Sequence, residues 1–198
     1  MPKIVDKEEK KLQIALSAKE LILTKGIRSI TVAEVAKVAG VGKGTIYEYF
    51  KNKNEIVFTL TTILMQEHID MVQKKLQTLS STKEKIHLFS QFFYDENLYE
   101  LREIYKEFIS LSLSEAEEQM IEFHHQSMQT YYALFENIIR NGVEKGELFP
   151  FSLEIMRGFF SAGNGMFFLY NATGTQQQLQ NDLDHFIENM FLIMEKKR

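Results

Sequence analysis

The chain has 198 residues, of which 44% are hydrophobic and none is cysteine, and its formal net charge is −4. This apolar content is high enough to bury a core, so an intrinsically disordered chain is excluded. Without cysteine there is no disulfide framework, no thiolate metal site and no thiol nucleophile. The sequence has no secretory signal and no apolar run near the roughly 20 residues that span a bilayer. We therefore expect a soluble, cytoplasmic protein with no membrane association.

The charge is unevenly distributed along the chain. Residues 1–55 carry 11 Lys/Arg against 7 Asp/Glu, a balance of +4, whereas residues 56–198 carry 12 against 20, a balance of −8. A basic N-terminal part on an acidic body favours a polyanionic partner at one end, although an imbalance of this size is also common on a solvated surface. Long stretches with a 3.6-residue apolar period and only two prolines predict an all-α fold.

The first fifty residues predict three helices. The first spans Lys7–Lys25 and ends at Gly26, a residue favoured at helix C-termini. Thr31 begins the second, with Glu34 three residues later completing a capping box, and Gly40 ends it. The third spans about Lys43–Phe50, so two short helices joined by a glycine-containing turn predict a helix-turn-helix.

The turn and third helix, "AGVGKGTIYEYF", also contain the residue types of a nucleotide-binding loop. A P-loop would need glycine at Lys37 and a hydroxyl at Gly44, and a dinucleotide fingerprint would need glycine at Thr45, so neither pattern fits. If Ile46 and Phe50 face inward, small, hydroxyl and cationic side chains remain outside, as a DNA recognition helix requires. The phosphate that this stretch meets is therefore predicted to be that of DNA.

The stretch "ITVAEVAKVAGVGKGTIYEYFKNKNEIV", Ile30–Val57, resembles the helix-turn-helix of the tetracycline-repressor (TetR) family of bacterial transcriptional regulators. One departure is Gly42, where the family often has a serine N-cap. The resemblance implies a DNA-binding domain over residues 1–53 and a helical ligand-binding and dimerisation domain over residues 54–198. It implies phosphate contacts by Thr31, Tyr47 and Lys53, and positions in or beside the major groove for Lys43, Gly44, Thr45 and Tyr49. The structural alternatives are that Thr31 is only a cap, that Tyr49 packs against the first helix and that Lys43 is a solvated lysine.

The body is predicted to contain helices at about 54–78, 82–95, 98–113, 114–145, 153–172 and 176–196. Its middle helices are rich in aromatic residues, which predict either a packed core or a cavity for a hydrophobic small molecule. The family resemblance favours the cavity. The predicted ligand-binding residues are Phe89, Phe93, Tyr105, Phe108, His124, Met128, Tyr131 and Phe135.

The last two predicted helices carry apolar stripes and small residues that allow close packing. Two such helices from each of two subunits would form a four-helix bundle about a two-fold axis. The alternative is that both helices cover the core of their own subunit. The predicted homodimer interface comprises Phe160, Phe167, Leu183, Phe186 and Met190.

These patterns predict a homodimeric repressor that a hydrophobic small-molecule effector releases from a palindromic double-stranded DNA operator. The alternative is a DNA-binding regulator controlled by a protein partner. An enzyme is not expected, because no motif for acid–base or nucleophilic catalysis is present. No cofactor and no metal are expected either: His124 and His125 are adjacent, and adjacent side chains on a helix point about 100° apart.

Overall fold

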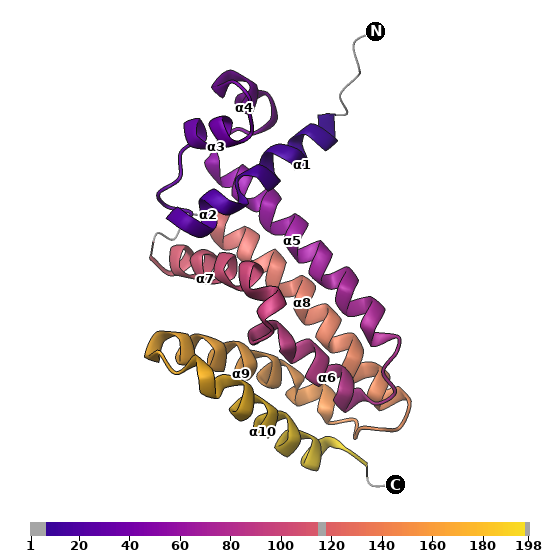
Figure 1. Ribbon diagram of the computed structural model, residues 1–198. Coiled ribbons are helices and arrows are strands. Elements are labelled where there is room, and N and C mark those ends of the chain that lie inside the picture. The colour runs from indigo at the N-terminus through magenta and orange to yellow at the C-terminus, as the bar shows by residue number, and fades with distance from the viewer. Residues whose placement is uncertain (1–6, 115–117, 197–198) are drawn as a thin grey trace. The chain divides into compact units, whose positions relative to one another are not determined.

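The computed structural model describes residues 7–114 and 118–196 (Figure 1). Within these ranges the regular elements are helices, and the only β-type pairing is an isolated bridge between Leu148 and Glu195. The predicted all-α fold is confirmed. The helices are α1 (Lys7–Ser17), α2 (Lys19–Lys25), α3 (Val32–Val38), α4 (Lys43–Tyr49), α5 (Lys53–Leu76), α6 (Thr82–Ser90), η1 (Gln91–Phe93), η2 (Glu96–Leu98), α7 (Tyr99–Ser114), α8 (Glu118–Glu144), α9 (Ser152–Thr173) and α10 (Gln176–Met194).

The chain forms two compact units. The first combines the residues up to Ile69 with Glu100–His124, and the second combines Asp70–Tyr99 with the residues from His125 onward. The compact units therefore do not divide the chain between residues 53 and 54, since α7 and the start of α8 pack into the first unit. The predicted division of roles at that point, DNA binding before it and ligand binding after it, stays a prediction.

The N-terminal helix is divided in two at Ala18, so the prediction of one helix over Lys7–Lys25 was wrong. The amide of Ala18 donates to the carbonyl of Ala15 at 3.1 Å, three residues back rather than four. The hydroxyl of Ser17 donates to the carbonyl of Ile14 at 2.7 Å. Ala18 is fully buried, so the bend lies against the core of the first unit.

The helix-turn-helix forms as its sequence predicts. The hydroxyl of Thr31 accepts from the amide of Glu34, and the Glu34 carboxylate accepts from the amide of Thr31, which completes the capping box at α3. Gly40 ends the segment with a φ of 66°, in the left-handed region that glycine adopts without strain. Ile46 and Phe50 are buried in the core of this unit, at 0% and 2% exposure. Their burial fixes which face of α4 points outward.

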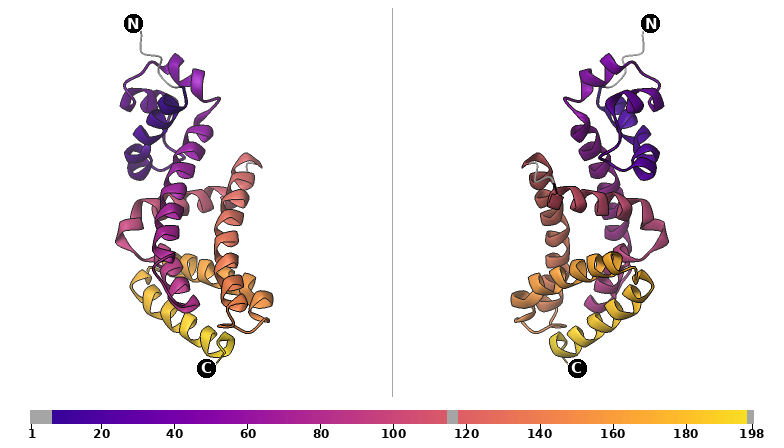
Figure 2. Two further views of the ribbon diagram at one scale, coloured as in Figure 1. Left: turned by 90° about the vertical axis from the view of Figure 1, so that its right-hand side faces the viewer. Right: turned by 90° about the vertical axis from the view of Figure 1, so that its left-hand side faces the viewer.

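In the second unit, α9 and α10 pair as an antiparallel hairpin, seen from two sides in Figure 2. Gly174, with a φ of 70°, ends α9 in the left-handed conformation. The hydroxyl of Tyr170 on α9 donates to the carboxylate of Asp182 on α10, which joins the two helices near the turn. The pairing fixes which side chains of α9 and α10 face the core.

Several predicted helices of the body have different bounds. The helix predicted to reach residue 95 ends at Ser90 and continues as the 3₁₀ turn η1. The long helix predicted from residue 114 is described from Glu118, and residues 115–117 lie outside the described residues. The final helix ends at Met194, because the chain there pairs with the loop before α9. The amide of Phe149, in that loop, donates to the carbonyl of Met194, and the amide of Lys196 donates to a carbonyl of the same loop.

Candidate nucleic-acid interface and ligand cavity

The outward face of α4 carries the chemistry expected of a DNA-reading helix. Lys43, Gly44 and Tyr47 are exposed, Tyr47 to 53%, and outside the local backbone of α4 no atom lies within 4 Å of the position that a Cβ on Gly44 would occupy. Thr45 is half-buried. Tyr49 is half-buried too and packs against the core of the unit. Of the five predicted positions on α4, four are therefore exposed or half-buried and do not belong to the core. Tyr49 is the exception.

Thr31 and Lys53, the other predicted phosphate ligands, are both engaged within the protein. The Thr31 hydroxyl donates to Glu34 Oε2 at 2.8 Å in addition to its capping role. Lys53 Nζ, at the start of α5, donates to the carbonyl of Arg28 at 2.9 Å, which ties α5 to the loop before α3. An ammonium group has three donors, so Lys53 retains two for a phosphate. Thr31 has no second hydroxyl proton.

The capping box has an electrostatic partner that no local sequence pattern indicates. Lys25 Nζ lies 2.7 Å from Glu34 Oε1. Hydrogen bonds from Lys25 and then from Thr31 lower the pKa of Glu34 to about 2. The carboxylate that holds the N-terminus of α3 therefore stays ionised throughout the physiological range. The ion pair with Glu34 offsets the charge of Lys25, so Lys43 is the more available cation for a DNA phosphate.

Helix α7 is fastened to the DNA-binding helices by three polar contacts within the first unit. Lys19 Nζ on α2 lies 2.8 Å from Glu100 Oε2, and this hydrogen bond raises the pKa of Lys19. Beyond α2, Glu107 accepts from the amide of Ile27 at 3.1 Å, and Arg28 donates to the hydroxyl of Ser114 at 3.2 Å. These partners are 80 or more residues apart, so no local pattern predicts them.

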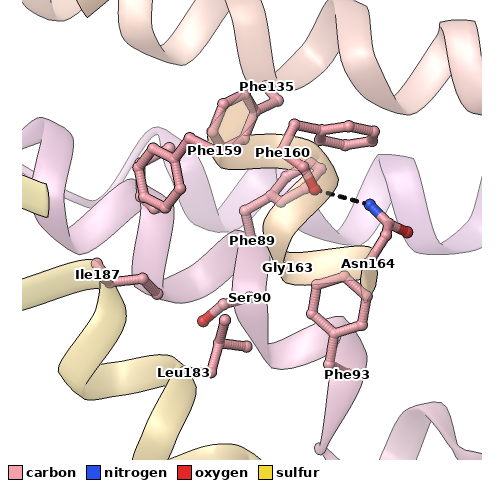
Figure 3. A pocket seen from close by; sticks show the side chains of 11 residues that line it. Phe89, Ser90, Phe93, Phe135, Phe159, Phe160, Gly163, Asn164, Leu183 and Ile187 are labelled. Atoms are coloured by element: carbon pink, nitrogen blue, oxygen red, sulfur yellow. Dashed lines mark hydrogen bonds between the residues drawn. The ribbon is translucent and has the colours of Figure 1, made fainter. Parts of the chain in front are cut away.

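A small apolar cavity lies within the second unit, among α6, η1, α8, α9 and α10 (Figure 3). Its volume is about 20 Å³, close to the space of one water molecule. The polar side chains in the lining, Ser90 and Asn164, already donate to backbone carbonyls. The lining residues are Ile86, Phe89, Ser90, Phe93, Phe135, Phe159, Phe160, Gly163, Asn164, Leu183 and Ile187.

The predicted ligand-binding residues are not gathered in one place. Phe89, Phe93 and Phe135 line the cavity. Tyr131 is buried in the same unit, with its ring centroid 6.4 Å from that of Phe89. Met128 is half-buried in this unit but does not belong to the lining.

The other three predicted ligand residues belong to the first unit. Phe108 packs in its core, with its ring centroid 5.2 Å from that of Phe123. The rings of Tyr105 and His124 lie 6.0 Å apart, and burial raises the pKa of the Tyr105 hydroxyl. Spacing along a helix shows which residues share a face. It does not show in which compact unit that face packs, because residues of both units have the same helical spacing.

Three of the five predicted dimer residues face the interior of their own subunit. Phe167 and Leu183 are each 2% exposed, and Leu183 lines the cavity together with Phe160. Their burial follows from the α9–α10 hairpin, which turns these side chains inward. Phe186 and Met190 are half-buried at the side of α10. Phe159 and Gly163, which the sequence patterns did not indicate as cavity residues, lie on α9, one of the two helices predicted to form the interface.

No group of three or more His, Asp or Glu residues in the described parts of the chain is arranged to hold a metal ion. None of the helices described combines the length and apolarity needed to cross a membrane.

Comparison with known proteins identifies the class. Residues 14–60, from α1 into α5, match the family model described as bacterial regulatory proteins, tetR family. The fatty acid metabolism regulator protein of Bacillus subtilis is 29% identical over 147 residues, which cover 72% of each chain. A crystal structure of Bacillus subtilis FadR in complex with stearoyl-CoA has a TM-score of 0.65 at 24% identity, covering 89% of this chain and 95% of that one.

A regulator from Saccharomonospora viridis crystallised with choline has a TM-score of 0.77 at 16% identity, covering 96% of this chain and all of that one. Helix-turn-helix geometry and these matches define a DNA-binding transcriptional regulator rather than an enzyme. The helix-turn-helix of the chain, within residues 14–60, belongs to the tetR family of bacterial regulatory proteins.

Proposed function

We propose that this regulator is a homodimeric, cytoplasmic repressor that a hydrophobic small molecule releases from a palindromic operator. The proposal rests on the presence of two features in one chain. One is an exposed recognition helix, and the other is an interior cavity lined almost wholly by aromatic and aliphatic side chains. Small-molecule sites have this composition. Lys43, Gly44, Thr45 and Tyr47 meet the DNA, with Lys53 on a phosphate.

The dimer would form through a row of apolar side chains beside the buried faces of α9 and α10. The row consists of positions at i, i+4 and i+7 on each helix, which share one side. On α9 the row ends at Leu169, which is 59% exposed, and on α10 it ends at Ile193, which is 60% exposed. An apolar row this exposed is typical of an interface. Its members are Ala162, Met166 and Leu169 on α9, and Phe186, Met190 and Ile193 on α10.

The ligand would bind by displacing the rings that now close the cavity. Because about 20 Å³ admits no organic molecule, the bound form must be a conformation in which these rings stand apart. A ligand that binds only this conformation shifts the population toward it, and DNA affinity falls if its recognition helices no longer match the operator. The relative named for fatty acid metabolism and the structure with stearoyl-CoA favour a ligand with a long acyl chain.

The experiment is selection of binding sites from a random DNA library, followed by titration with stearoyl-CoA and, separately, choline. We expect a palindrome whose half-sites are about 34–36 Å apart, because two recognition helices must meet successive major grooves. Stearoyl-CoA should weaken binding to it, and choline should not. The result that would support control by a protein partner has two parts. Neither ligand changes the operator affinity, and the regulator binds DNA only while a partner protein is bound to it.

A further inference from the structure

Four polar side chains close the outer edge of the contact between α6 and α10. Lys83 Nζ lies 3.0 Å from Glu188 Oε2. His87 Nδ1 lies 3.1 Å from Asp184 Oδ1, and its Nε2 lies 3.1 Å from Glu188 Oε1. We call Lys83, His87, Asp184 and Glu188 the α6–α10 latch. The histidine stands between two carboxylates, one at each ring nitrogen.

The latch lies directly outside the cavity. On α10, the cavity residues Leu183 and Ile187 immediately precede the two latch carboxylates, and on α6 Ile86 immediately precedes the latch histidine. Neighbouring positions on a helix point about 100° apart, so the contact has an apolar inner row and a polar outer row. Figure 3 shows the inner row, with Leu183 and Ile187 of α10 facing Ser90 of α6.

From this arrangement we infer that the latch is the gate of the cavity: a ligand is admitted when α6 separates from α10, and protonation of His87 holds the two helices together. The inference rests on the proposed function, since it concerns access to the proposed ligand site. Helix α6 is the wall best suited to move, because it has only nine residues and is followed by the short turn η1. Helices α9 and α10 are much longer and pair with each other.

The neutral and the protonated form of the His87 ring differ in how well they join α6 to α10. A neutral imidazole has one N–H and can donate to one carboxylate, whereas an imidazolium donates from both nitrogens. Both ring nitrogens of His87 face carboxylate oxygens, so only the protonated ring satisfies the two contacts at once. The neutral ring directs a lone pair at a carboxylate, which is repulsive. Low pH therefore tightens the contact between α6 and α10, and high pH loosens it.

Two groups near His87 have pKa values shifted away from the neutral range. Hydrogen bonds from Lys83 and then His87 lower the pKa of Glu188, so this carboxylate stays ionised. Tyr94, after η1, lies within the electrostatic reach of Asp184, and burial raises the pKa of its hydroxyl, so it stays neutral. Histidine is the side-chain type that ordinarily titrates between pH 5 and 8.

The test is stopped-flow binding of the neutral, apolar fluorophore N-phenyl-1-naphthylamine to the full chain. Its association rate should fall about two- to fivefold from about pH 8 to about pH 5.5, the range expected when one partly exposed ion pair forms or breaks. Asp184→Asn with Glu188→Gln should raise the rate at the lower pH and remove the pH dependence. His185→Gln, which changes an exposed histidine of α10 outside the latch, is the matched control and should keep the wild-type profile.

A cross-link gives a second test, because the chain has no cysteine of its own. Lys83→Cys with Glu188→Cys, bridged by a short bis-maleimide, should slow uptake of the fluorophore at every pH, whereas the unbridged pair should not. Gly163→Leu should abolish binding by filling the cavity, since even a Cβ there would lie 3.4 Å from the Phe93 ring. If the fluorophore does not bind, or binds Gly163→Leu as well, the proposed ligand site is wrong. If it binds at the cavity but neither pH nor the bridge alters its rate, the latch is wrong and the site stands.

Discussion

Gly44 offers a substitution that should stabilise the protein and weaken its function together. Gly44 lies in the first turn of α4, is exposed, and has open space where a Cβ would stand. Alanine loses less backbone entropy than glycine in a helix, so Gly44→Ala should stabilise the free protein by about 0.5 kcal/mol. For a chain of this length that corresponds to a rise in melting temperature of about 1–2 °C.

The same methyl group should obstruct DNA if Gly44 permits close approach to the major groove. An extra methyl in a well-packed contact costs about 1–3 kcal/mol. In the proposed dimer, two recognition helices double that cost, so operator affinity should fall at least about thirtyfold. Calorimetry and fluorescence anisotropy with operator and with random DNA measure the two effects, and random DNA should be affected less.

Thr24→Ala is the matched control for the gain in helix propensity. Thr24 is exposed on α2, and its hydroxyl donates only to carbonyls of its own helix, at 2.8 Å to Glu20 and 3.3 Å to Leu21. This variant should also melt slightly higher, with operator affinity unchanged. A Gly44→Ala protein that is more stable and binds operator as tightly as wild type would refute the close approach of α4 to DNA.

The recognition helix, the proposed interface and the capping box can each be tested by one substitution. Lys43→Ala should reduce the slope of log K against log[salt] by about 0.9 for each phosphate that the lysine neutralises in the wild type; an unchanged slope with relaxed sequence preference would make Lys43 a base-reading residue. Met190→Asp would bury an unpaired carboxylate at the proposed interface, so gel filtration should show monomers, whereas Gln177→Asp on the opposite side of α10 should remain dimeric; two dimers would place the interface elsewhere. Glu34→Gln should melt below wild type at neutral pH. The pKa of Glu34 is lower in the folded than in the unfolded state, so the ionised carboxylate stabilises the fold at pH values above the unfolded pKa, and the difference should vanish as pH falls from about 4.5 toward about 2. A difference that persists at the acid end would contradict the role given to the Glu34 carboxylate.

The helix-turn-helix could be predicted from the sequence because its determinants are local. The hydroxyl of Thr31 and the carboxylate of Glu34 are three residues apart, and Gly40 supplies the left-handed turn directly after α3. The burial of Ile46 and Phe50 follows from their i, i+4 spacing. Each of these features depends on residues within about one helical turn, where side-chain chemistry alone decides the conformation.

The cavity and the interface depended on information that no local pattern contains. An apolar stripe on α9 or α10 shows that a face is buried, and both the partner helix and a second subunit could bury it. The hairpin of α9 and α10 turns Phe167 and Leu183 to the core of the subunit, against the prediction. Likewise Phe108 has the same aromatic character as Phe89, but it packs in the other compact unit.

The measurement that tests the inducible-repressor mechanism most directly is a pair of titrations with operator DNA and stearoyl-CoA, each performed with and without a saturating amount of the other. In the proposed mechanism both ligands act on one conformational equilibrium, so the factor by which stearoyl-CoA weakens operator binding must equal the factor by which operator weakens stearoyl-CoA binding. We predict equal factors of at least about five in both directions, corresponding to a coupling of about 1 kcal/mol or more. Stearoyl-CoA that fails to bind, or that binds without changing operator affinity, would contradict this mechanism.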